Sequence, residues 1–147
     1  MENDDRKDLI ELGEKLKDSG RIEDLMTIMR ILLSERGCPW DRKQTHVTLL
    51  KHMKEETEEV ADAVKAEDWD NLCEELGDVL MQIAFHCELA REEKRFTLED
   101  VIHGLNSKLV RRHPHVFGNK TGINDPEHVL KQWAEIKKQE KLDKNEK

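Results

Sequence analysis

Apolar residues recur along this chain at intervals of three and four, the spacing that places them on one face of an α-helix. No stretch alternates apolar and polar residues in the way a half-buried strand would. The expected helices span about 9–20, 22–35, 45–66, 68–93, 97–113 and 126–141, with loops at 37–41 and 113–125. The predicted fold class is therefore all-α, a helical bundle.

The helices 45–66 and 68–93 are expected to form a central antiparallel hairpin, because only a short break near Glu67 and Asp68 separates them. Asp68 is a plausible N-cap for the second of these helices. One apolar stripe of that helix consists of Leu72, Leu76, Val79, Leu80, Ile83 and Cys87. After Asp78 a second stripe consists of Met81, Phe85 and Leu89. A helix that is apolar on two faces is central to its fold, and in so short a chain we expect the second face to meet another subunit.

Two acidic clusters face each other across this break. In each cluster two carboxylates lie three residues apart and so share a helix face: Glu56 and Glu59, then Glu75 and Asp78. Glu56 and Asp78 are equally distant from position 67, and so are Glu59 and Glu75, so an antiparallel hairpin places all four at matching heights. Converging acids repel one another unless a cation lies between them, and oxygen ligands favour Mg²⁺ or Mn²⁺.

Glu56 strengthens the metal interpretation, because it falls within the apolar stripe between Met53 and Val60. An ionised carboxylate that faces a core is costly unless it is paired or bound to metal. The alternative interpretation is an ordinary solvated helix face, since Glu-rich helices are common. A di-iron carboxylate bundle is disfavoured, because it uses Glu-x-x-His motifs and neither acidic cluster contains one.

Basic and aromatic side chains form two further motifs near the C-terminus. Lys108 and Arg112 lie four residues apart at the end of a predicted helix, with Arg111 beside them. Trp133 and Lys137 repeat that spacing in the last helix. The functional interpretation is phosphate binding by the cations and stacking or edge packing of the Trp on a planar base. The alternative is compensation of the helix dipole, solubility and a packed Trp.

The sequence Gly37-Cys38-Pro39-Trp40-Asp41 interrupts the helical pattern and predicts a loop. Trp40 is interpreted either as a plug of the core or as a wall of a base pocket. Cys38 is expected to be a small buried residue and not a nucleophile, because no Cys-His-Asn/Asp arrangement can be recognised around it.

The composition narrows the class of protein. The chain has 147 residues, of which 39% are charged and 4% aromatic, and its net charge is −8. That charge disfavours nucleic-acid binding but is compatible with a phosphorylated ligand that metal and local basic residues neutralise. No apolar run approaches the roughly 20 residues of a membrane span, and the polar N-terminus does not resemble a signal peptide. Three widely spaced cysteines fit a reducing cytoplasm.

Six motifs follow one another along the chain: GCPWDRKQTH, KEETEEVADAV, EELGDVLMQIAFH, FTLEDV, KLVRRHPHVFG and QWAEIKKQEK. Together they resemble the MazG family of all-α nucleoside triphosphate pyrophosphohydrolases. The resemblance covers residues 22–141. It implies hydrolysis of nucleoside triphosphates to monophosphate and pyrophosphate, with Mg²⁺, on an oligomeric four-helix core that a homodimer completes. We expect a helical extension at 1–20, the MazG-like domain at 21–141 and a disordered tail at 142–147.

The resemblance also suggests roles for the candidate site residues. The metal motif of the family, EExxE followed by ExxD, suggests as ligands Glu56, Glu59, Glu75 and Asp78. Glu55 points about 100° away from Glu56 on the helix. It could touch a second metal ion, act as a base through water, or orient a ligand. The suggested nucleotide contacts are Lys108, Arg112, Trp133 and Lys137, with Arg111 and Trp40 as further candidates.

The principal hypothesis is metal-assisted hydrolysis of the α–β phosphoanhydride, in which Mg²⁺ bridges phosphate oxygens and lowers the pKa of a bound water. The alternative from another class is a non-catalytic interaction module, in which the stripe of Met81, Phe85 and Leu89 binds a partner helix. A third hypothesis, a housecleaning enzyme for damaged or non-standard nucleotides, differs from the first only in its substrate.

Overall fold

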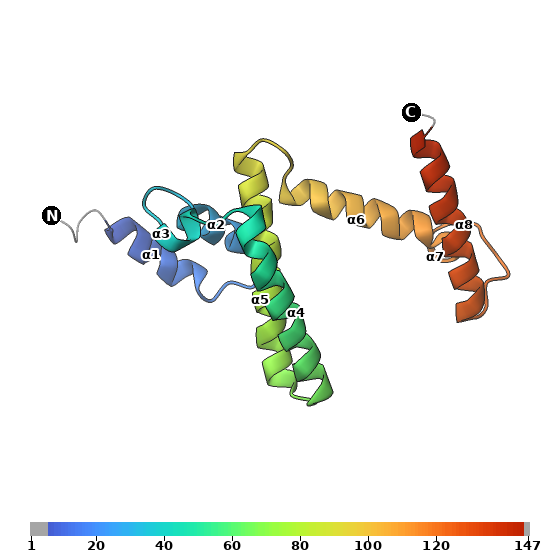
Figure 1. The fold of residues 1–147 in the computed structure, drawn as a ribbon, viewed down its shortest axis with the longest axis horizontal. Helices are drawn as coiled ribbons and strands as arrows, with labels where there is room; N and C mark the ends of the chain where they lie inside the picture. The colour runs from blue at the N-terminus through green and yellow to red at the C-terminus, as the bar shows by residue number, and fades with distance from the viewer. Residues whose placement is uncertain (1–5, 146–147) are drawn as a thin grey trace. The chain divides into compact units, whose positions relative to one another are not determined.

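The computed structural model describes residues 6–145, and each regular element in that range is a helix (Figure 1). The helices are α1 (Lys7–Leu16), α2 (Ile22–Leu32), α3 (Pro39–Arg42), α4 (His46–Lys65), α5 (Trp69–Glu92), α6 (Leu98–Arg112), α7 (Pro114–Phe117) and α8 (Pro126–Asn145). The predicted all-α class is confirmed. Among these helices none is long and apolar enough to cross a membrane.

The chain divides into two compact units, which the sequence pattern does not predict. The N-terminal unit covers Met1–Leu98 and the C-terminal unit covers Glu99–Lys147. Within the described residues, the first unit contains α1 to α5 and the second contains nearly all of α6, with α7 and α8. The expected extension at 1–20 belongs to the first unit, although its residues 1–5 lie outside the described range.

The predicted hairpin is present: α4 and α5 pack along each other as antiparallel helices (Figure 1). Thr45 caps α4, because its hydroxyl oxygen accepts the Thr48 N–H at 3.2 Å while the Thr48 hydroxyl accepts the Thr45 N–H at 2.8 Å. Asp68 caps α5 by accepting the Asn71 N–H at 3.2 Å, as the sequence predicts. Glu67 completes the turn in the left-handed region, at a φ of 53°. Local signals therefore define the start of each helix and the turn between them.

The core of the N-terminal unit lies where α2 and α4 pack against α5. Its buried residues are Met29, Leu33, Leu49, Ala84 and Phe85. The prediction that Met81, Phe85 and Leu89 meet a neighbouring subunit is wrong for Phe85, which is only 2% exposed, and Leu89 packs against the same core. The physical reason is that α2, itself strongly apolar, covers this face of α5 within the chain.

Part of the other apolar stripe of α5 is exposed. Its exposed residues are Leu76, Leu80 and Ile83, and we call these three the outer stripe. These residues are spaced by four and three, so they form a continuous apolar row along the helix. The expected two-faced character of α5 is thus present, with Phe85 and Leu89 packed in the core and the outer stripe exposed.

Two short helices occupy stretches that the sequence pattern predicts as loops. Pro39 and Pro114 stand at the first position of α3 and α7, where a missing backbone N–H costs no hydrogen bond. Gly37 allows the chain to fold back over the end of α2, because a Cβ there would lie 2.2 Å from the carbonyl oxygens of Ile31 and Leu32. This sharp turn places α3, and with it Trp40, beside the hairpin.

Three other boundaries differ from the prediction. The first helix ends at Leu16, before Gly20, and the second ends at Leu32. The last helix continues beyond Lys141 to Asn145, so the tail expected at 142–147 is helical in its described part, and residues 146–147 lie outside that part. Asp125 caps this helix, since its carboxylate accepts the His128 N–H at 3.0 Å.

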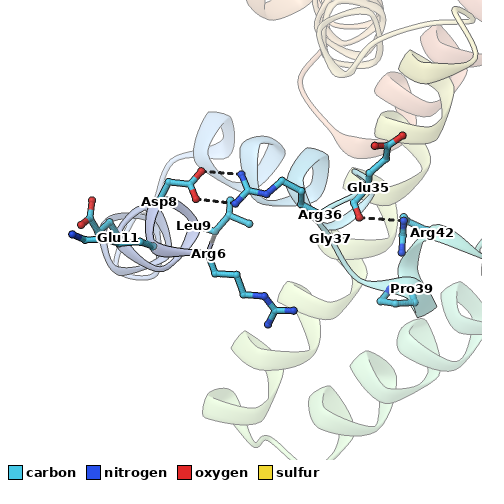
Figure 2. A pocket seen from close by; sticks show the side chains of 10 residues that line it. Arg6, Asp8, Leu9, Glu11, Glu35, Arg36, Gly37, Pro39 and Arg42 are labelled. Carbon is cyan, nitrogen blue, oxygen red and sulfur yellow. Dashed lines mark hydrogen bonds and ion pairs between the residues drawn. The ribbon is translucent and has the colours of Figure 1, made fainter. Parts of the chain in front are cut away.

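An ion pair fastens α1 to the end of α2. The Arg36 guanidinium donates to both carboxylate oxygens of Asp8, at 2.8 and 2.9 Å, and this hydrogen bonding lowers the pKa of Asp8 to about 2. Figure 2 shows the pair at the edge of an open cavity of about 1120 Å³, bounded also by Arg6, Pro39 and Arg42. None of the hairpin carboxylates lines this cavity.

Candidate functional site

The hairpin brings four carboxylates together. Glu56 and Glu59 come from α4, and Glu75 and Asp78 come from α5. Each offers one oxygen such that all four oxygens lie within 4.8 Å of one another. This is the convergence that the register about position 67 predicts. No ion pair formed within residues 6–145 involves any of the four.

The pKa values of this cluster reflect crowding of like charges. Burial, followed by the nearby charge of Glu59, raises the pKa of Glu56. Hydrogen bonding to the Glu59 carboxyl, followed by burial, raises the pKa of Glu75 to about 7. Without a cation the cluster therefore favours retention of a proton near neutral pH.

The donor set fits a hard divalent cation. The Oε2 atoms of Glu56 and Glu75 are buried, and neither has a hydrogen-bond partner among the described residues. A buried carboxylate oxygen without a partner is costly unless a cation or an unseen donor contacts it. Four carboxylates also supply only oxygen ligands, which Mg²⁺ and Mn²⁺ prefer.

Glu55 lies outside this cluster, on an exposed part of α4. Its Oε1 is 3.8 Å from the Lys51 Nζ, and its Oε2 is 3.8 Å from the His52 Nδ1. This position agrees with the helical wheel, on which the Glu55 side chain points away from that of Glu56. Glu55 is therefore a neighbour of the candidate metal site and not one of its four convergent carboxylates.

Trp40 is not a plug of the core, because it is 55% exposed. Its ring meets the His52 ring edge-on, with the ring centroids 5.8 Å apart. His52 does not feature in the sequence motifs, although its position four residues before Glu56 is a signal that could have found it. The core-plug interpretation of Trp40 is therefore wrong, and its role in a base pocket stays a prediction.

The basic motif lies in the C-terminal unit, where Glu140, an acid that sequence reasoning missed, pairs with both arginines. The Arg111 Nε donates to the Glu140 Oε1 at 2.7 Å, and the Arg112 Nη2 donates to the Oε2 at 3.2 Å. Hydrogen bonding by Arg111, then by Arg112, lowers the pKa of Glu140 to about 2. The two arginines therefore have a structural role in joining α6 to α8.

Trp133 lies against the same end of α6. The His113 ring packs edge-on against it at 5.3 Å, while the His113 Nδ1 lies 2.5 Å from the Leu109 carbonyl oxygen. The His113 ring is thus held to the backbone at the end of α6. In the described part of the chain, the Arg112 Nε and the Trp133 Nε1 are buried donors without an acceptor. Lys108 is half-buried and Lys137 is exposed.

The fold and the site define an all-α protein whose central helix hairpin carries an ExxE and an ExxD motif with convergent carboxylates. Residues 44–117 match the model of the MazG nucleotide pyrophosphohydrolase domain, and the chain belongs to this family. The resemblance that the sequence motifs indicate is therefore confirmed.

Two curated relatives are similar over most of the chain. The nucleoside triphosphate pyrophosphohydrolase/pyrophosphatase MazG of Thermotoga maritima is 50% identical over 127 residues, 86% of this chain and 48% of that protein. The nucleoside triphosphate pyrophosphohydrolase of Escherichia coli K12 is 46% identical over 125 residues, 84% of this chain and 47% of that protein. The chain thus spans about half the length of these relatives.

A solved structure shares the fold. The crystal structure of a mazG-related protein from Thermotoga maritima superposes with a TM-score of 0.67 at 36% identity. The match covers 80% of this chain and 99% of that chain. The all-α architecture is thus common to both.

Proposed function

We propose that this chain hydrolyses the α–β phosphoanhydride of nucleoside triphosphates and releases nucleoside monophosphate and pyrophosphate. The observation that carries the proposal is the hairpin cluster, with four convergent carboxylates and two buried oxygens that have no partner in residues 6–145. Membership of the MazG family supports a nucleotide as the substrate. Relatives named nucleoside triphosphate pyrophosphohydrolase support the same reaction.

The residues that would hold Mg²⁺, or Mn²⁺, are Glu56, Glu59, Glu75 and Asp78. The cation would neutralise phosphate oxygens and lower the pKa of a bound water. The carboxylates would position it, because α4 and α5 pack against each other and each contributes two of the four. Glu55 lies beside the cluster, and it would accept a proton through water or orient a ligand.

The basic residues of the C-terminal unit would neutralise the triphosphate. Arg112 is the strongest candidate, because its Nε is buried without an acceptor while its Nη2 is bound to Glu140. Lys108 and Lys137, for which the described residues supply no ion-pair partner, would act as point charges. Arg111 would mainly hold Glu140. The buried Trp133 Nε1, also without an acceptor in residues 6–145, supports a ligand contact there.

A second copy of this chain is proposed to cover the outer stripe of α5. The row of Leu76, Leu80 and Ile83 is exposed on α5, the helix that supplies two members of the carboxylate cluster. Pairing two hairpins through this row would complete a four-helix core. Substitution Leu80→Glu is expected to convert the dimer to a monomer in light scattering. A wild-type protein that is already a monomer would contradict the proposal.

The substrate is proposed to be a free nucleotide, with damaged or non-standard triphosphates as the preferred class if the enzyme serves housecleaning. The discriminating test is a pyrophosphate-release screen across standard, deoxy and modified triphosphates, with Mg²⁺ and with Mn²⁺. We expect release only when a divalent cation is present. A matched thermal-shift measurement uses Mg²⁺ and a non-hydrolysable triphosphate. An interaction module would show neither release nor a shift, and that result would contradict the proposed hydrolysis.

A further inference from the structure

Trp40 and His52 form an aromatic corner on the N-terminal unit. Trp40 presents a large exposed ring from α3, and the His52 ring from α4 meets it edge-on, with an angle of 65° between the planes. Both residues belong to the same compact unit as the four carboxylates. Their position relative to the candidate metal site is therefore set by the fold of one unit.

The helical register places this corner beside the carboxylate cluster. His52 precedes Glu56 by four residues, so the two side chains lie on the same face of α4. Four residues correspond to about 6 Å along a helix axis. In a nucleoside triphosphate a single ribose separates the α-phosphate from the base. If the phosphates of a nucleotide are held at the cluster, its base can therefore lie level with His52 along the axis of α4.

The two side chains offer complementary means of holding a base. An exposed indole provides a face on which any base can stack. The His52 Nδ1 lies 3.8 Å from the Glu55 Oε2, whereas its Nε2 has no hydrogen-bond partner in the part of the chain described. An imidazole nitrogen of this kind can donate to or accept from the edge of a base.

We propose that Trp40 and His52 form the base-recognition site of this chain, in which Trp40 stacks on the base and the His52 Nε2 hydrogen-bonds to its edge. The inference rests on the proposed hydrolysis and goes beyond it, because it assigns discrimination among bases to His52. A polar group that must be paired discriminates more strongly between ligands than an apolar wall does. Stacking on Trp40, by contrast, strengthens binding of all bases alike.

The test compares pyrophosphate release from nucleoside triphosphates of different bases with release from ribose 5-triphosphate, which has no base. Trp40→Ala is expected to lower kcat/KM for every nucleoside triphosphate by about 10- to 100-fold. It should leave the value for ribose 5-triphosphate unchanged. The control is Trp69→Ala, since Trp69 is a 62% exposed Trp at the start of α5 and outside this corner. This control should affect neither substrate class.

His52 is tested by two substitutions. His52→Phe keeps an aromatic ring against Trp40 but removes the nitrogen, and His52→Ala removes both. We expect both to change the order of preference among bases, while only His52→Ala also weakens all bases together. Circular dichroism identifies any variant that fails to fold, and His52→Phe remains informative if His52→Ala does not fold.

Two results would overturn the base-recognition site. One is an equal loss of activity on ribose 5-triphosphate and on the nucleotides, and the other is an unchanged order of bases in His52→Phe. A wild-type protein that releases no pyrophosphate from any triphosphate is a different result, because it contradicts the proposed hydrolysis itself.

Discussion

The two candidate sites of this protein differ in whether their charged side chains have partners of opposite charge within the chain. In the hairpin, Glu56, Glu59, Glu75 and Asp78 converge without a cationic partner from residues 6–145. In the C-terminal unit, Arg111 and Arg112 converge on Glu140, which forms an ion pair with each of them. The first cluster has no counter-charge among residues 6–145, whereas the second contains one of its own. Convergent like charge is therefore the stronger indication of a ligand.

The largest expected effect comes from removing one charge of the hairpin cluster. Glu59→Gln and Asp78→Asn should each lower the rate of pyrophosphate release at least about 100-fold. Even the substitution of a residue that only hydrogen-bonds to a metal ligand commonly lowers metal affinity or activity about 10- to 100-fold. Both variants should stay folded, since each relieves repulsion. Glu58→Gln is the matched control, on the same helix and outside the cluster. Near-normal Mg²⁺-dependent release by the cluster variants would refute the metal assignment.

The cation requirement predicts a pH-dependent stabilisation by Mg²⁺. In the metal-free protein the pKa of Glu75 is raised from 4.5 to about 7. The folded state thus binds a proton more tightly than the unfolded state, and the stability it contributes is complete below pH 4.5 and lost as the pH rises through about 7. Mg²⁺ must displace that proton, so its stabilising effect should be larger above pH 7 than at pH 5.

Thermal melts with EDTA and with Mg²⁺ at both pH values test this expectation. At 100 times the dissociation constant, a cation that binds only the folded state adds about 2.7 kcal/mol to the free energy of unfolding. Asp78→Asn should reduce the shift. A shift that is equal at the two pH values, or unchanged in the variant, would argue against a cation at this cluster.

Smaller effects are expected for Arg112 and Glu140. They test whether the arginines bind phosphate as well as holding α6 to α8. Arg112→Ala should lower kcat/KM about 10- to 100-fold if Arg112 also contacts phosphate, since a charged hydrogen bond contributes about 1.5–3 kcal/mol. Glu140→Gln frees the guanidinium groups and should leave kcat/KM equal or higher. If both substitutions lower kcat/KM alike, the arginines only position the helices.

The lowered pKa of Glu140 predicts that its contribution to the free energy of unfolding is lost in acid. Its folded-state pKa is lowered from 4.5 to about 2, so its contribution is complete above pH 4.5 and is lost as the pH falls through about 2. The difference in free energy of unfolding between wild type and Glu140→Gln should therefore be present at pH 7 and disappear near pH 2. Urea titrations at the two pH values measure it, and a difference that persists at pH 2 would contradict the ion-pair explanation.

The carboxylate cluster could be predicted from the sequence because its causes are local. Helical spacing places Glu56 with Glu59 and Glu75 with Asp78, and a short turn capped by Asp68 sets their heights. The Asp125 cap and the end of α6 before Pro114 follow from equally local rules. The motifs that carry the family resemblance lie on these same elements.

Other features could not be predicted because they depend on contacts between distant residues. Both stripes of α5 are apolar, and only the packing of α2 decided that Phe85 is buried and Leu80 exposed. Arg111 and Glu140 are 29 residues apart, and their pairing follows from how α8 returns to α6. The contact of Trp40 with His52 likewise depends on the turn at Gly37.

The sequence by itself determined the helices, the hairpin and the heights of its four acids, because backbone geometry repeats over a few residues. Only the tertiary structure decided which apolar face is covered, that Arg111 and Arg112 pair with Glu140, and that Trp40 packs against His52. In each case several residues of similar chemistry, distant in sequence, could have made the contact. Only the packing of the helices selects which of them does.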